Sequence, residues 1–172
     1  MTDAEAERAL HSLVAALGEP ERRDAASADL LALGPRAREA VRAGLGDGRW
    51  QVRRWCVQWI WRFPEPGDVK VLEPLLRDPK SRVRHSALVA LSNAPATDPS
   101  DVVSLLLERI LVDQSLRVRR QAVLLLAWLH PHPDLERFFA ELEECERDAK
   151  LRKYACIGRL RSRARVEDPA SC

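Results

Sequence analysis

The sequence from Asp78 to Leu91 reads DPKSRVRHSALVAL and describes the start and the body of one amphipathic helix. Ser81 is a residue type that caps helix N-termini, so we expect the helix to begin there. Val83, Ala87 and Leu91 follow one another at spacings of four residues, which places them on one face of the helix. That face is predicted to be part of the core.

The same pattern recurs along the chain. The first core position of each copy is taken by Val52, Val83, Val118 and Leu151. These positions are separated by 31, 35 and 33 residues, and an aspartate precedes each of them. A unit of this length that returns at nearly constant spacing indicates stacked helix pairs.

These units resemble HEAT repeats, which carry an aspartate in the turn and an arginine six residues later. The pairs that match this spacing are Asp47/Arg53, Asp78/Arg84 and Asp113/Arg119. In Asp148/Arg152 the spacing is two residues shorter, so the last repeat is expected to be irregular. The resemblance implies that the arginines bond to the turn aspartates of their own and adjacent repeats. It is specific for fold and says almost nothing about function.

The predicted fold is all-α, a right-handed α-solenoid of about five HEAT-like helix pairs. Residues 1–165 are expected to form a single repeat domain, and residues 166–172 a frayed C-terminal tail. The expected helices cover residues 4–17, 20–33, 35–46, 49–63, 67–77, 81–94, 100–112, 115–130, 134–147 and 149–165. The longest connector runs from Pro95 to Pro99.

Composition limits the possible functions. Charged residues make up 31% of the 172 residues, but the net charge is only +2, which argues against wholesale polyanion binding. We find no apolar run long enough for a membrane span and no signal-peptide pattern at the acidic N-terminus. The four cysteines (Cys56, Cys145, Cys156 and Cys172) lack metal-ligand spacing. We therefore expect a reduced, cytoplasmic protein without a metal or cofactor.

Charge follows the repeat. The second helix of each pair, in segments 49–62, 81–97, 114–130 and 149–165, contains arginine or lysine and neither aspartate nor glutamate. The first-helix segments 98–113 and 131–148 are rich in acidic residues. In the HEAT-like arrangement the second helices line the concave face. The resemblance therefore implies a basic concave face and an acidic convex one.

A helical wheel predicts which second-helix residues face this groove. Two residues after the first core position the chain has Arg54, His85, Arg120 and Lys153. Six residues after it the chain has Gln58, Val89, Leu124 and Ile157. Trp61 adds an exposed aromatic, whereas Trp59 is assigned to the core and Trp128 to packing against a neighbouring repeat. The candidate binding residues are Arg54, Trp61, His85, Val89, Arg120, Leu124, Lys153 and Ile157.

This mixture of cations and apolar groups favours a non-enzymatic scaffold that holds an acidic, amphipathic segment of a partner protein. The alternative is nucleic-acid binding, supported by the seven cations of residues 150–165. A relationship to alkylpurine DNA glycosylases would need a carboxylate from a loop, such as Asp47, Asp113 or Asp148. Phycobilin lyases carry similar repeats, but nothing in the sequence selects them. His130 and His132 flank a proline and are assigned to a turn. The oligomeric state stays open, including a second copy in the groove.

Overall fold

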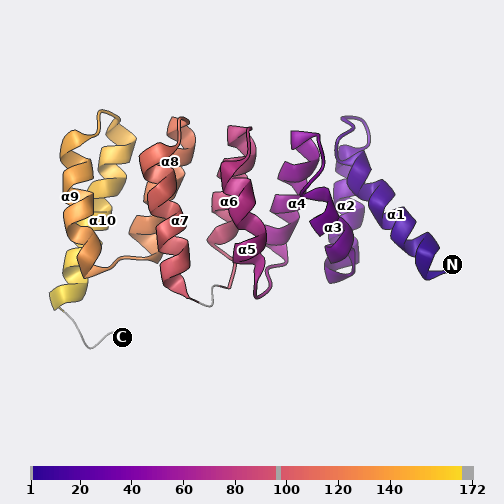
Figure 1. Ribbon diagram of the computed structural model, residues 1–172, viewed down its shortest axis with the longest axis horizontal. Helices are drawn as coiled ribbons and strands as arrows, with labels where there is room; N and C mark the ends of the chain where they lie inside the picture. The colour runs from indigo at the N-terminus through magenta and orange to yellow at the C-terminus, as the bar shows by residue number, and fades with distance from the viewer. Residues whose placement is uncertain (1, 96–97, 168–172) are drawn as a thin grey trace. The chain divides into compact units, whose positions relative to one another are not determined.

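The computed structural model describes residues 2–95 and 98–167, and within these ranges its regular structure is entirely helical (Figure 1). The chain divides into two compact units, Met1–Pro95 and Ala96–Cys172. Each unit is a set of antiparallel helix pairs with its own core. The prediction of an all-α solenoid is confirmed.

Unit 1 contains three helix pairs. Its elements are α1 (Asp3–Ala16), α2 (Arg23–Leu33), η1 (Gly34–Ala37), α3 (Arg38–Gly44), α4 (Trp50–Arg62), α5 (Asp68–Leu72), η2 (Glu73–Arg77) and α6 (Ser81–Leu91). Thr2 and Glu5 form a capping box at the start of α1. Gly34 has a φ of 54° where α2 ends, a conformation that glycine adopts without strain.

Unit 2 contains two helix pairs. Its elements are α7 (Pro99–Val112), α8 (Leu116–Leu129), η3 (Pro133–Leu135), α9 (Glu136–Cys145) and α10 (Ala149–Glu167). The predicted frayed tail begins at Val166, yet α10 continues through Glu167. The rest of that tail lies outside the described residues.

The second helices of consecutive repeats pack on each other: α4 on α6 in unit 1, and α8 on α10 in unit 2. Each second helix also packs on the first helix of its own pair. The first helices of three repeats begin or end in a short 3₁₀ turn that contains a proline, at Pro35, Pro74 or Pro133. Proline lacks the amide hydrogen that an α-helix needs in its interior, which explains why these segments are broken.

The core follows the predicted pattern. Most of the predicted core positions of the second helices are buried: Val52, Cys56, Ile60, Val83, Ala87, Leu91, Val118, Ala122, Leu126, Leu151 and Ala155. Three of the positions eleven residues after the first core position are less buried than predicted, because they lie at or beyond the helix ends: Phe63 and Ala94 are half-buried, and Leu129 is 48% exposed. Trp59 is also buried, as predicted, and its Nε1 donates to the Leu30 carbonyl over 3.0 Å. Burial of these side chains supplies the main favourable term for folding.

Two glycines let helices approach closely. A Cβ on Gly44 of α3 would lie 2.5 Å from Val14 and 2.6 Å from Cys56. A Cβ on Gly158 of α10 would lie 2.6 Å from the ring of Phe139 on α9. The absence of a side chain at these positions therefore sets how close the packed helices come. Within residues 2–95 and 98–167, no helix has the length and apolar character needed to cross a membrane.

Candidate functional site

The second helices α4, α6 and α8 all begin with the same side-chain turn. An aspartate carboxylate accepts a hydrogen bond from the backbone N–H two residues later, over 2.7, 2.7 and 2.8 Å at Asp47, Asp78 and Asp113. This Asx turn sets the direction of the chain before the helix. The expectation that Ser81 caps α6 is wrong. Ser81 is the first helical residue, and its hydroxyl is not the cap.

The arginine next to the first core valine has a structural role in α4. Arg53 donates to both carboxylate oxygens of Asp78, over 2.6 and 2.9 Å, and to the backbone carbonyl of Asp47, over 2.8 Å. The hydrogen bond with Asp78 raises the pKa of Arg53. Arg84 donates to the backbone carbonyl of Asp78 over 2.8 Å. In unit 1 these contacts confirm that the arginine six residues after the turn aspartate binds its own turn, and that Arg53 also binds the next one.

The last repeat follows the same rule, with a glutamate in place of the aspartate. Glu146 lies 33 residues after Asp113, and its Oε1 accepts from the backbone N–H of Asp148 over 3.2 Å. Its Oε2 accepts from Arg119 over 3.1 Å. The interpretation of Asp148 and Arg152 as the turn pair of an irregular repeat is therefore corrected. Glu146 and Arg152 have the regular spacing of six residues.

Asp148 has a different partner, Arg120. Its Oδ1 accepts from Arg120 Nε over 2.8 Å and from the backbone N–H of Leu151 over 2.9 Å, while Oδ2 accepts from Arg120 Nη2. The hydrogen bond from Arg120 is the main reason that the pKa of Asp148 falls to about 2. Arg120 was predicted to face a ligand in the groove. The structure instead gives this charge a carboxylate within the protein.

The other three residues predicted two positions after the first core position differ in their exposure. The Arg54 guanidinium lies 5.9 Å from the ring centroid of Trp55, and its side chain is half-buried. His85 is also half-buried, whereas Lys153 is exposed. These three residues lie on second helices as predicted, but their side chains are not equally accessible to a ligand.

The predicted apolar positions are partly accessible. Val89, Leu124 and Ile157 are half-buried on α6, α8 and α10. Trp61, at the end of α4, is 44% exposed, as the wheel predicted, and its backbone carbonyl accepts from Asn93 Nδ2 over 2.8 Å. Its exposure is consistent with a contact role, which stays a prediction.

Trp128 was assigned to packing against a neighbouring repeat, and the structure shows it to be 50% exposed. It does have a neighbour in the next repeat. The guanidinium of Arg161 lies 4.7 Å from its ring centroid, and Arg161 donates to the backbone carbonyls of Ala127 and Trp128 over 3.1 and 3.3 Å. One side of the indole is therefore held by Arg161 while half of the side chain stays accessible.

Helix periodicity places further residues on the same side of α8 and α10 as this contact, and together they form a surface. Residues three or four apart lie on the same side of a helix. The surface, called the α8–α10 face below, consists of Arg117, Arg120, Leu124 and Trp128 on α8 and of Lys150, Lys153, Ile157, Leu160 and Arg161 on α10. Five of these were not among the predicted site residues: Arg117, Trp128, Lys150, Leu160 and Arg161. The 33-residue spacing between Arg117 and Lys150, and between Trp128 and Arg161, is the signal that could have identified them.

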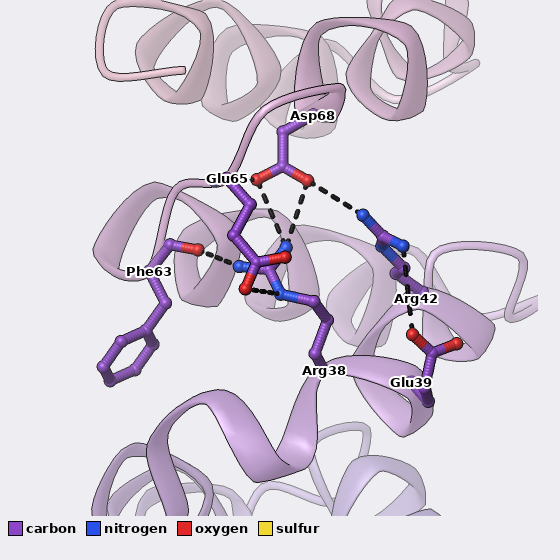
Figure 2. A network of polar contacts seen from close by, with 6 residues as sticks. All are labelled: Arg38, Glu39, Arg42, Phe63, Glu65 and Asp68. Atoms are coloured by element: carbon purple, nitrogen blue, oxygen red, sulfur yellow. Dashed lines mark hydrogen bonds and ion pairs between the residues drawn. The ribbon is translucent and has the colours of Figure 1, made fainter. Parts of the chain in front are cut away.

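A buried ion-pair network lies in unit 1 (Figure 2). Arg38 of α3 donates to both oxygens of the fully buried Asp68, over 3.1 and 3.3 Å, and to the Phe63 carbonyl. Its Nε lies 2.9 Å from a Glu65 oxygen, and Arg42 donates to Asp68 over 3.4 Å. Two guanidinium groups therefore neutralise one carboxylate. These ion pairs have a structural role, because they connect α3 with the start of α5. The valine-based repeat pattern gave no signal for this network.

The cysteines and histidines do not form a reactive centre within the part of the chain that the structure describes. Burial, followed by the Asp47 charge, raises the pKa of the Cys56 thiol to about 12. Cys145 is exposed and Cys156 is half-buried, both as free thiols, and Cys172 lies outside the described ranges. Across residues 2–95 and 98–167, no three histidine, cysteine or acidic side chains form a group that could hold a metal ion.

Comparisons with known proteins agree with this geometry. Residues 38–127 match the family model described as HEAT repeats. A crystal structure of an engineered protein from the Northeast Structural Genomics Consortium is similar, with a TM-score of 0.57 and 19% sequence identity. The alignment covers 95% of this chain and 75% of that one, and at this identity it supports the fold alone. No curated protein matches the sequence.

Proposed function

The chain belongs to the HEAT-repeat family, and we propose that it is a non-enzymatic scaffold whose second helices hold an acidic segment of a partner protein. HEAT repeats are arrays that commonly mediate protein interactions. In this proposal the contacts come from three of the predicted cations (Arg54, His85 and Lys153) and from the predicted apolar residues (Trp61, Val89, Leu124 and Ile157), whereas Arg120 is paired with Asp148. Each unit has its own set of these residues: Arg54, Trp61, His85 and Val89 lie in unit 1, and Leu124, Lys153 and Ile157 lie in unit 2.

One observation carries the proposal: exposed apolar groups occur beside cations on helical segments that lack carboxylates. Residues 50–62, 81–91, 116–129 and 149–164 contain no aspartate or glutamate. The same helices expose Trp61, Trp128 and Leu160. Tryptophan and arginine are the residue types most enriched among interface hot spots, and an apolar patch beside like charges favours a partner of opposite charge.

The carboxylates nearest to these helices support a scaffold over an enzyme. Asp78 binds Arg53, Asp148 binds Arg120, and Asp113 accepts a backbone N–H at the start of α8. Asp68 is neutralised by two arginines. A carboxylate that must stabilise a developing cation cannot also be neutralised by a guanidinium. These contacts weigh against the glycosylase-like alternative.

The nucleic-acid alternative rests on the cations of α10, and several of these have partners. Arg159 binds Glu143 on α9 over 2.9 Å, and Arg161 caps α8 and stacks on Trp128. Exposed cations on α10 include Lys150, Arg152 and Lys153. Lys150 and Lys153 lie on the same side of α10 as Ile157 and Leu160, apolar side chains that a phosphate backbone does not contact. The mixed surface therefore favours a peptide.

The test is a selection from a random peptide library displayed on phage, with the full chain as bait. We expect the enriched peptides to be acidic and to carry aromatic or branched aliphatic residues. In parallel, fluorescence anisotropy with labelled single-stranded and duplex DNA at about 50 and about 200 mM salt tests the alternative. Enrichment without acidic bias would overturn the proposal. Tight DNA binding that collapses at the higher salt would favour the nucleic-acid function.

A further inference from the structure

The α8–α10 face has a polarity along its length. Contacts at both ends show that the two helices run in the same direction and in register. Arg120 near the start of α8 binds Asp148 just before α10, and Arg161 near the end of α10 binds the carbonyls of Ala127 and Trp128 near the end of α8. The N-terminal ends of both helices are therefore adjacent, and so are the C-terminal regions (Figure 1).

The cations lie near the N-terminal ends of the helices. Arg117, Lys150 and Lys153 are exposed there, and the charge of Arg120 is balanced by Asp148. Helix N-termini carry partial positive charge, so these side chains add to a field of the same sign. The placement destabilises the isolated helices slightly, and an acidic ligand would relieve it.

The apolar groups lie one to three turns further along the same face. Leu124 and Ile157 are half-buried in the middle, and Trp128 and Leu160 follow with 50% and 54% of their surfaces exposed. The Arg161 guanidinium stacks on Trp128 and limits its rotamers. A pre-ordered aromatic side chain loses little entropy on binding, which suits it to act as an anchor.

We infer that the α8–α10 face docks an acidic peptide segment. An apolar side chain of the peptide packs against Trp128 and Leu160, and its carboxylates lie toward Lys150, Lys153 and Arg117. This inference rests on the proposed scaffold function and assigns the binding site to unit 2. Charge complementarity selects the occupant. The residues of this face include no aspartate or glutamate, so a second copy bound through the same face would bring no opposite charge to these cations, which disfavours self-association.

The experiment uses the peptide most enriched in the phage selection, labelled with fluorescein, and measures its Kd by anisotropy with full-length variants. Trp128→Ser removes the anchor, and Lys153→Glu reverses one exposed charge. Trp61→Ser tests the alternative site in unit 1, because Trp61 is an exposed tryptophan at the end of a second helix there. Leu111→Ser is the matched control, because Leu111 is 69% exposed on the first helix α7 and lies outside the α8–α10 face. Circular dichroism and thermal melts confirm that each variant is folded.

We expect Trp128→Ser and Lys153→Glu each to weaken binding at least about tenfold, and Leu111→Ser to change it less than about twofold. A peptide with one carboxylate changed to lysine should regain affinity for Lys153→Glu, which a merely structural role of Lys153 would not produce. If Trp61→Ser abolishes binding and Trp128→Ser does not, the inference is wrong and the scaffold function stands. If the selection yields no acidic peptides, the proposed function itself fails. Competition of the labelled peptide by DNA at equal affinity would assign the face to nucleic acid.

Discussion

At the scale of single residues, Asp148 links the last two second helices. Its pKa of about 2 lies below the ordinary value of 3.8, because the folded protein stabilises the carboxylate through Arg120 and the backbone of Leu151. The folded state therefore binds a proton less readily than the unfolded state. The resulting stabilisation is present above the ordinary pKa and is lost as the pH falls through about 2.

We therefore predict that Asp148→Asn lowers the melting temperature near neutral pH, and that the difference from the wild type shrinks as the pH falls from about 5 to about 2. Thermal melts across this range provide the measurement. Asp134→Asn is a suitable control, because Asp134 is exposed on η3 and far less involved in the fold. A difference that stays constant down to the lowest pH would show that the pKa of Asp148 is not depressed.

Ala87 provides a second test at this scale. It is fully buried in α6, so Ala87→Asp places a carboxylate in the core without a partner. We predict a loss of at least about 3 kcal/mol in the free energy of unfolding, measured by urea denaturation. The exposed Ala9 in α1 gives the matched control Ala9→Asp, which should stay close to the wild type. A cooperative, wild-type-like transition in Ala87→Asp would contradict the assigned helix register.

Residue-level predictions from the sequence succeeded where one helix face decides burial. The i, i+4 spacing placed Val83, Ala87 and Leu91 in the core without knowledge of any other repeat. It failed for Arg120 because a wheel describes one helix at a time. Whether a cation faces solvent or a carboxylate from the next turn depends on a contact 28 residues away.

At the scale of elements, α9 and α10 pack closely because Gly158 lacks a side chain. An added Cβ would lie 2.6 Å from the fully buried Phe139 ring, too near for either group to keep its place. We predict that Gly158→Ala costs about 1–3 kcal/mol, despite the better helix propensity of alanine. Urea denaturation measures this loss.

Gly48→Ala is the control for this experiment, because a Cβ there would meet nothing within 4 Å and the residue lacks a positive φ. We expect its unfolding transition to match that of the wild type or to rise slightly. A Gly158→Ala variant as stable as Gly48→Ala would show that α9 and α10 can separate at little cost.

The element boundaries were well predicted because prolines and glycines mark them. The second helices, predicted at residues 49–63, 81–94, 115–130 and 149–165, occupy Trp50–Arg62, Ser81–Leu91, Leu116–Leu129 and Ala149–Glu167. The residues that form the turns before the second helices were harder to predict from the sequence. The role of Glu146 was missed because a pattern that requires aspartate overlooks a residue with the same carboxylate on a longer side chain.

At the scale of the whole molecule, repeat proteins distribute stability locally, since each repeat contacts mainly its neighbours. We predict that Gly158→Ala lowers amide protection most in α9 and α10, and much less in α4 and α6. Hydrogen exchange followed by mass spectrometry measures this gradient. A uniform loss of protection along the chain would show instead that it unfolds as one cooperative unit.

The architecture could be predicted because the repeat period appears directly in the sequence. The division at Pro95 and Ala96 falls in the connector that the sequence marks as the longest. The prediction of one domain over residues 1–165 stays a prediction, as does the location in the cytoplasm. Periodicity specifies which faces of the helices are buried, but it does not show which exposed-face side chains find a partner in the next repeat, as Arg120 does with Asp148.

The links between α8 and α10 also bear on how such a chain can grow. Arg119 and Arg120 bind Glu146 and Asp148, so the α7–α8 repeat donates to the turn that opens α10. A tandem duplication of residues 116–148 would copy the donors and their acceptors together. The new copy would meet an acceptor turn of its own at the following second helix. Unequal recombination could therefore lengthen the gene by a whole repeat without a compensating mutation at the junction.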